Sequence, residues 1–177
     1  VSSGRALLKS GIPTMGNIFA GNGYSTGIFG KWHMGSNYPY RPQDRGFEES
    51  VWFPSSHIGS VSDFWGNDYF DDTYWNNGKK QKYEGYCTDI FFSESKRFIE
   101  ESIDQGKPFF AYVSTNTPHG PLYPKEEDYK VLEKLFDKSE FAGEKGLKSR
   151  LVKYLAMIRN IDSNIGDLTD FLNDKGV

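Results

Sequence analysis

The chain has little cysteine, no long apolar run and almost no charge imbalance, and each of these excludes a class of protein. Its single cysteine, Cys87, excludes an intrachain disulfide and a four-thiolate zinc site. The longest apolar stretches, such as 109–113, are far shorter than the roughly 20 residues that cross a bilayer, so we expect no membrane span. With 21 basic and 24 acidic residues the net charge is -3, and nothing overall attracts nucleic acid or an anionic membrane.

The composition is that of a globular protein, with 37% hydrophobic and 25% charged residues among 177. This length suits one modest domain, so we expect a single domain over 1–177. The chain opens with V-S-S-G and has no initiator Met or signal-peptide pattern. It therefore reads as an internal piece of a longer protein, truncated at both ends.

Local patterns predict helices alternating with strands. Thr14 is a candidate N-cap for a short helix that ends before Gly21 and Gly23, and Thr88 is a candidate N-cap for a helix to about Glu101. Apolar residues at helical spacing predict a last helix over 151–172, closed by Lys175 and Gly176. The predicted strands are 24–29 and a buried parallel strand over 107–113. This order predicts an α/β fold.

Residues 35–85 show no sustained period and are rich in turn-forming residues, so we predict a long irregular excursion. Within it, Asn76-Asn77-Gly78 predicts a tight turn between two short strands. Many of the chain's aromatic residues lie between Trp52 and Tyr86. They either pack a loop-rich subdomain or form a sugar-stacking surface, and packing is the more common use of such rings.

Two loops follow predicted strands at their carboxyl ends, the edge where open α/β sheets bind ligands. The first contains Lys31 and His33, and the second contains His119. An ammonium group and imidazoles suit a tetrahedral oxyanion, because they supply positive charge, hydrogen bonds and proton transfer near neutral pH. These residues point to phosphate or sulfate chemistry.

The amino-acid sequences of these segments resemble those of the type I sulfatases of the alkaline phosphatase superfamily. Residues 23–35 read G-Y-S-T-G-I-F-G-K-W-H-M-G, similar to the family's G-Y-x-T strand running into G-K-W-H-x-G. Residues 41–47 (R-P-Q-D-R-G-F) resemble the segment that follows this signature, and residues 107–110 (K-P-F-F) leading to 117–121 (T-P-H-G-P) resemble a later strand and loop of the family. The helix over 154–166 is also similar, so the likeness spans nearly all of the chain in the family's order.

The resemblance implies a fragment of an alkaline-phosphatase-like α/β/α sandwich from a sulfuric ester hydrolase. In that family a formylglycine, made from the Cys or Ser of a C/S-x-P-x-R motif, attacks the sulfur of a sulfate ester. The resemblance implies that Lys31, at the matching motif position, would bridge the formylglycine and the sulfate. It likewise implies that His33 would hold the formylglycine hydrate and help to eliminate sulfate. His119 would bind the sulfate near the leaving oxygen. Each role places a donor where negative charge develops.

The family's nucleophile and calcium ligands are expected outside this piece. Matching Arg5 to the nucleophile motif would put Val1 at the nucleophile and leave too few residues before Lys31, so Arg5 is expected to be a solvated side chain. Asp71 and Asp72 mimic the family's Ca²⁺-binding aspartate pair but follow Lys31 instead of preceding it, so we expect them to flank the hairpin. We therefore expect no complete metal site and an inactive fragment of a Ca²⁺-dependent enzyme.

Three further residues attract attention. His57 is a candidate substrate contact or a structural loop histidine, and Cys87 is expected to be a small buried hydrophobe without a catalytic role. Arg45 is expected to order the loop around Asp44 and Gly46.

The expected partner is a small-molecule or carbohydrate sulfate ester, and the resemblance implies a periplasmic or extracellular protein. The alternatives are a phosphoester or phosphonate hydrolase of the same superfamily and a non-catalytic relative that binds sulfated glycans.

Overall fold

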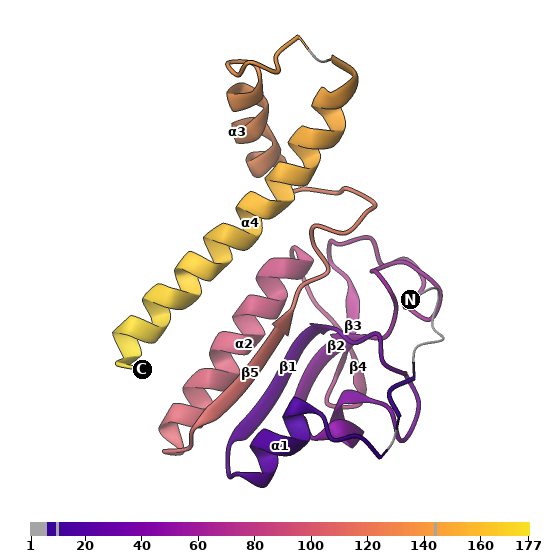
Figure 1. Cartoon of the computed structure of the whole chain (residues 1–177), viewed down its shortest axis with the longest axis vertical. Coiled ribbons are helices and arrows are strands. Elements are labelled where there is room, and N and C mark those ends of the chain that lie inside the picture. Colours follow the sequence, from indigo (N-terminus) through magenta and orange to yellow (C-terminus); the bar gives the residue numbers. More distant parts are fainter. Residues whose placement is uncertain (1–6, 10, 144) are drawn as a thin grey trace. The chain divides into compact units, whose positions relative to one another are not determined.

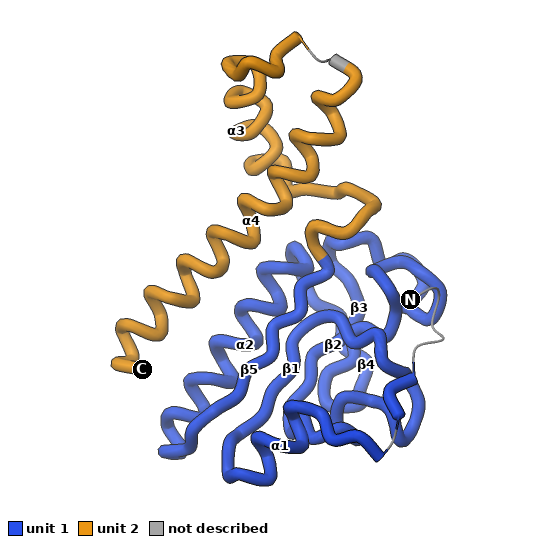
Figure 2. Tube along the Cα trace, in the orientation of Figure 1, with its two compact units in different colours: residues 1–116 blue, residues 117–177 orange. Residues whose placement is uncertain are grey.

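A computed structural model describes residues 7–9, 11–143 and 145–177. The chain divides into two compact units, residues 1–116 and residues 117–177, shown in separate colours in Figure 2. The first unit is a mixed sheet with helices and the second is a pair of helices (Figure 1). The predicted α/β class is confirmed.

The first unit is built on a five-stranded sheet in the order β4-β3-β2-β1-β5. Its central strand β1 (Ser25–Lys31) runs parallel to β2 (Glu49–Phe53) and to β5 (Phe109–Ser114). Strand β3 (Thr73–Asn76) is antiparallel to β2 and forms a hairpin with β4 (Lys79–Lys82). The hairpin turn at Asn77 and Gly78 is confirmed, and both residues have positive φ, as this kind of turn requires. The three parallel strands bring their carboxyl ends to one edge.

The prediction that 35–85 is one irregular excursion is wrong in part. It contains β2 and a short 3-10 helix, η1 (Pro42–Arg45), besides the hairpin. Strand β2 opens on Glu49 and Ser50, so its sequence lacks the longer apolar run that identified the strand over 107–113. It is a strand because it pairs with residues 27–31 of β1, which a local pattern does not show.

Strand β5 is parallel, as predicted, but it is not a buried strand. Its side chains are half-buried, and Tyr112 is exposed. Among the described residues β5 stands at the end of the strand order, so only one of its two edges is paired.

The two helices of the first unit begin for different reasons: a local capping signal sets the start of one, and a tertiary contact sets the start of the other. Helix α1 (Met15–Gly21) begins at the predicted cap, where the Thr14 hydroxyl accepts a bond from the Asn17 N–H at 3.1 Å. Helix α2 (Cys87–Asp104) is capped at Tyr86, so the expected cap at Thr88 is wrong. Tyr86 forms a β-bridge with Phe70, which keeps its backbone extended, and the helix begins at the next residue.

Aromatic side chains fill both faces of the sheet. Helix α2 runs beside β1 and β5 in Figure 1, and its Phe91 and Phe98 pack against Phe53 and Phe29, with ring centroids 6.0 and 5.6 Å apart. On the opposite face, the buried cluster comprises Ile28, Trp32, Phe47 and Trp52, packed against Trp75 and Phe110. Packing is therefore the main use of the aromatic-rich segment, although Trp65 is fully exposed.

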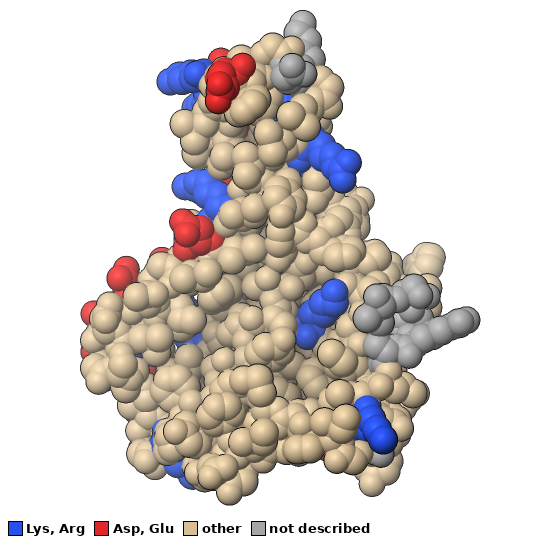
Figure 3. All heavy atoms as spheres, viewed as in Figure 1, with Lys and Arg blue, Asp and Glu red and all other residues tan. Residues whose placement is uncertain are grey.

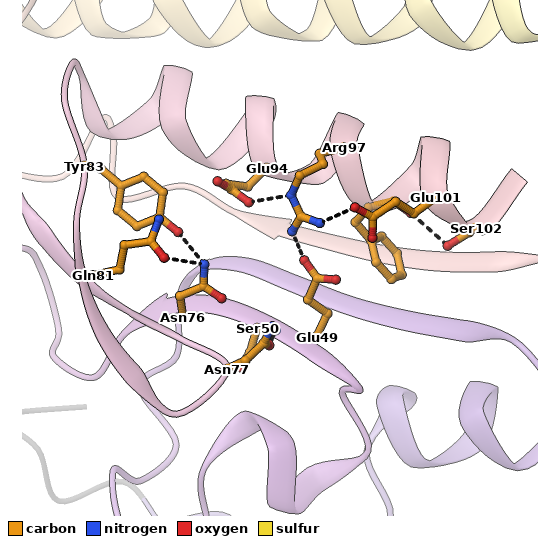
Figure 4. Close-up of polar contacts among 11 residues, drawn as sticks. Glu49, Ser50, Asn76, Asn77, Gln81, Tyr83, Glu94, Arg97, Glu101 and Ser102 are labelled. Atoms are coloured by element: carbon orange, nitrogen blue, oxygen red, sulfur yellow. Dashed lines mark hydrogen bonds and ion pairs between the residues drawn. The ribbon is translucent and has the colours of Figure 1, made fainter. Parts of the chain in front are cut away.

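A network around Arg97 joins α2 to β2 (Figure 4). The guanidinium of Arg97 pairs with Glu94 at 3.0 Å and with Glu101 at 2.8 Å, both on α2, and it also pairs with Glu49 on β2. The hairpin is tied to β2 as well, because the Ser50 N–H donates to the Asn77 side chain at 2.8 Å. One cation thus holds three carboxylates across two elements.

The second unit pairs α3 (Glu126–Phe136) with α4 (Lys145–Lys175). Arg159 of α4 forms an ion pair with the buried Asp128 of α3. The predicted last helix is confirmed, but most of its apolar stripe is not buried: Tyr154, Ile158 and Ile165 are exposed, while Val152, Ala156 and Met157 are buried. None of the helices in the described chain has a window apolar enough to cross a membrane.

Candidate active site

Lys31 is the last residue of β1, at the carboxyl edge of the parallel strands. Its carbonyl accepts a hydrogen bond from the Ser114 hydroxyl at 2.7 Å, which fixes the end of β1 against the end of β5. Gly30, just before it, has φ +119°, and a Cβ there would collide with the Ser114 carbonyl. The glycine of G-K-W-H therefore allows β1 and β5 to approach closely where Lys31 leaves the sheet.

Trp32 fixes the backbone between the two candidate catalytic side chains. Its N–H donates to the Phe53 carbonyl at 3.1 Å, and its indole Nε1 donates to the Tyr40 carbonyl at 2.8 Å. Its ring is buried in the cluster of the sheet face. Because Trp32 is held at both ends, Lys31 and His33 leave a rigid segment, and the tryptophan of the motif is structural.

Lys31 and His33 both have lowered pKa values. Burial lowers the pKa of Lys31. Burial and then the charge of Lys31 lower the pKa of His33, so its ring is neutral at pH 7. An anion bound between these groups would favour the charged form of both.

His57 lies in the loop after β2, at the same edge of the sheet as Lys31 and His33. Its carbonyl accepts from the Ser55 hydroxyl at 2.6 Å, and its Nδ1 lies 3.2 Å from the Ser56 hydroxyl. The next residue, Ile58, donates its N–H to the Asn116 side chain at 3.0 Å. The structure thus ties the His57 loop to the segment directly after β5.

Asn116 is a residue that the sequence analysis missed. It is buried, and its Nδ2 has no hydrogen-bond partner in the described chain. The one signal in the sequence is its place three residues before His119, in the loop that is expected to contact the substrate.

His119 belongs to the second unit, apart from Lys31 and His33 in the first. Its Nδ1 lies 2.6 Å from the Gly120 carbonyl. A carbonyl only accepts, so Nδ1 carries a proton, and the neutral ring presents Nε2 as an acceptor.

The aspartate pair is structural. The Asp72 carboxylate accepts bonds from the N–H groups of Asp68 and Tyr69 and from the Tyr74 hydroxyl, at 2.8 to 3.0 Å. Asp71 accepts from the Gly85 N–H at 2.7 Å. The described residues contain no group of three or more His, Cys, Asp or Glu that could hold a metal ion. The expected hairpin role of the pair is confirmed.

Cys87 is buried, as expected, and burial raises the pKa of its thiol. Arg45, expected to order the loop around Asp44 and Gly46, donates from its guanidinium to the carbonyls of Lys9 and Ile12, whereas Arg41 pairs with Asp44. Arg45 is buried and joins the segment before α1 to η1, a contact between residues too distant in sequence to predict. Arg5 lies outside the described residues.

The fold and site define an α/β protein with a cationic lysine and a histidine at the carboxyl edge of its parallel strands. The sulfatase family model matches residues 3–177, and the chain belongs to the sulfatase family. Its five-stranded sheet is part of the alkaline-phosphatase-like fold of these enzymes, as the resemblance implied.

Two curated relatives illustrate the match. The chain is 26% identical over 168 residues to N-acetylgalactosamine-6-sulfatase of Sus scrofa, covering 89% of this chain and 28% of that protein. It is 29% identical over 120 residues to an ulvan-active sulfatase of Formosa agariphila, and the match covers 66% of this chain and 22% of that protein. The chain thus spans less than a third of the length of these relatives.

A solved structure of Ps i-CgsB in complex with k-i-k-neocarrahexaose matches with a TM-score of 0.79 and 24% identity. The match covers 97% of this chain and 38% of that one, and it shows the fold.

Proposed function

We propose that this chain is the sulfate-holding part of a sulfuric ester hydrolase that acts on a sulfated carbohydrate. The observation that carries the proposal is the Lys31 ammonium at the carboxyl edge of β1, with His33 two residues further on. Membership of the sulfatase family supports a sulfate ester as substrate. Relatives named for N-acetylgalactosamine-6-sulfate and ulvan support a carbohydrate.

In this proposal each residue acts on a charge that develops during hydrolysis. Lys31 holds an oxygen of the sulfate, since a half-buried ammonium interacts strongly with an oxyanion. His33 is neutral at pH 7 and can accept a proton. His119 donates a hydrogen bond to the oxygen of the leaving alcohol.

The described residues do not fit a calcium ion. The oxygens of Asp71 and Asp72 already accept bonds within the hairpin region, and no cluster of three possible ligands occurs in the described part of the chain. We derive no step through a metal.

In this proposal the nucleophile is a formylglycine that lies outside residues 1–177. None of the 177 residues is a Cys or Ser standing two positions before a proline, which C/S-x-P-x-R requires. The residues present here therefore bind and protonate, and the attack on sulfur is made elsewhere in the protein.

The proposal is tested by binding. Titration of the purified chain with N-acetylgalactosamine 6-sulfate, N-acetylgalactosamine 6-phosphate and the unsulfated sugar, followed by NMR, should show the sulfate ester bound most tightly. Lys31→Met should weaken it by roughly tenfold or more, because a charge-assisted bond contributes about 1.5–3 kcal/mol.

Lys107→Met is the matched control, since Lys107 is an exposed lysine two residues before the start of β5. It should leave the affinity unchanged. Equal weakening by both variants would contradict the proposal, and tighter binding of the phosphate ester would favour a phosphoester hydrolase.

A further inference from the structure

A cavity of about 440 Å³ lies within the second unit, lined by the segment after β5 and by helix α4. Its volume falls in the range of about 300–1,000 Å³ that is usual for small-molecule sites. The segment contributes Pro118, Gly120 and Leu122 to the lining. The wall of the cavity therefore includes both neighbours of the candidate catalytic His119.

One face of α4 forms the other wall of the cavity. Leu147, Leu151 and Tyr154 follow the spacing of four and three residues that brings side chains to one face of a helix, and all three line the cavity. Leu147 is 46% exposed and Tyr154 is 41% exposed, so this wall is open to a ligand. A tyrosine ring has an apolar body and a polar tip, which suits a sugar ring.

Arg150 supplies the charge of this cavity. It lies on the same face of α4, it is exposed, and none of the lining residues is acidic. Two residues earlier on the helix, Lys148 pairs with Asp137 at 2.7 Å. Among the residues that the structure describes, no carboxylate pairs with Arg150 in this way. The guanidinium is therefore available to an anion from outside the chain.

The chemistry of the two walls defines the ligand. A guanidinium is a planar fork of donors that matches two oxygens of a carboxylate or of a sulfate group. The leucines and the tyrosine ring offer a surface for the apolar face of a ring. In a carbohydrate substrate these two features occur together in an acidic sugar, which is either a uronate or a sugar with a second sulfate ester. A neutral sugar would leave Arg150 without an anion.

We propose that this cavity binds an acidic sugar unit of the substrate, with its anionic group on Arg150 and its ring on Leu151 and Tyr154. The inference rests on the proposed function, which makes the substrate a sulfated carbohydrate. It narrows the substrate class to a polyanionic glycan and makes Arg150 a specificity-determining residue. The anionic group on Arg150 is distinct from the sulfate ester that is hydrolysed.

The test is NMR titration of the 177-residue chain with methyl β-D-glucuronide, which has a carboxylate and no sulfate. Methyl β-D-glucoside is the neutral control, and sodium acetate is an anion without a ring. The glucuronide should shift the backbone N–H signals of Gly120, Leu151 and Tyr154 and bind roughly fivefold more tightly than either control. Methyl β-D-glucoside 6-sulfate is titrated in parallel, and the tighter of the two acidic sugars identifies the anionic group.

Arg150→Gln should weaken glucuronide binding by roughly fivefold, to the affinity of the neutral glucoside, because the ion pair is lost and the ring contacts remain. Arg150→Lys keeps the charge and should restore part of the affinity. Lys153→Gln is the matched control, since it removes one positive charge from the same helix at a residue outside the lining, and it should have no effect. Thermal unfolding of the three variants checks that they fold.

The acidic-sugar site is overturned if neither acidic sugar binds more tightly than the neutral glucoside. It is also overturned if the folded Arg150→Gln and Lys153→Gln variants bind the glucuronide alike. Because the glucuronide has no sulfate, these results are independent of the Lys31 test. Glucuronide binding without sulfate-ester binding would overturn the proposed function and leave the acidic-sugar site standing.

Discussion

Individual side chains of the first unit show two uses of charge. Lys31 is half-buried at the carboxyl end of β1. Burial alone lowers its pKa, so no neighbouring carboxylate stabilises its charge in the described chain. Asp72, in contrast, is buried and surrounded by donors. The first is suited to bind an external anion, and the second organises its own loop.

His33 makes anion binding depend on pH. Its pKa is lowered in the free protein, and a bound sulfate would raise it, so affinity for a sulfate ester should increase as the pH falls through the range in which this ring takes up its proton. Titrations between pH 5 and 8 measure the effect. His33→Gln should reduce the dependence of this affinity on pH. An unchanged dependence on pH would contradict a contact between His33 and the sulfate.

Asp72 should make stability fall as the pH rises from about 4 to about 6. Burial raises its pKa from 3.8 to about 6, so in this range the folded state binds more protons than the unfolded one. Asp72→Asn should lower stability by about 1–3 kcal/mol, because an amide nitrogen cannot accept the bonds of Tyr69 and Tyr74.

Urea unfolding at several pH values measures both effects of Asp72→Asn. The gap between the wild type and the variant should narrow from pH 4 to pH 6. Curves that stay parallel over this range would show that Asp72 does not titrate there.

Helix α2 and strand β2 are joined by one arginine, and this connection belongs to the scale of elements. Arg97 holds Glu94 and Glu101 of its own helix together with Glu49 of the strand (Figure 4). Without the guanidinium these carboxylates would repel one another, and Glu49 is largely buried.

Arg97→Gln should therefore lower the free energy of unfolding by about 1–2 kcal/mol at pH 7. Glu101→Gln is the control, since Glu101 is the most exposed partner, and it should cost less than about 0.5 kcal/mol. Equal losses would mean that the pair with Glu101 alone carries the contribution of Arg97, and would contradict the role of the buried Glu49. Chemical denaturation of the two variants decides between these results.

For the whole molecule, the two compact units separate the candidate site residues: Lys31, His33 and His57 lie in the first and His119 lies in the second. On the face drawn in Figure 3, Lys and Arg side chains are separated from one another and form no continuous basic patch.

The 177-residue chain should not hydrolyse 4-nitrophenyl sulfate, because its sequence contains no C/S-x-P-x-R from which the nucleophile could form. Release of 4-nitrophenol measures this. Turnover that Lys31→Ala abolishes would contradict the prediction, whereas turnover that persists in Lys31→Ala would come from a contaminant.

The sequence by itself determined the features that depend on short-range spacing. Thr14 capping Asn17, the Asn77-Gly78 turn and the periodicity of α4 all involve residues within a few positions of one another. The ordered motifs around Lys31 and His119 were sufficient to indicate the sulfatase family.

Only the tertiary structure decided the features that depend on distant partners. Strand β2 exists through β1, helix α2 begins where Tyr86 meets Phe70, and much of the apolar stripe of α4 stays exposed. The Ser114 hydroxyl that fixes Lys31 lies 83 positions away, and Asn116 is 58 positions from Ile58. Contacts at such separations leave no local periodicity, because they form only when the sheet brings its strand ends together.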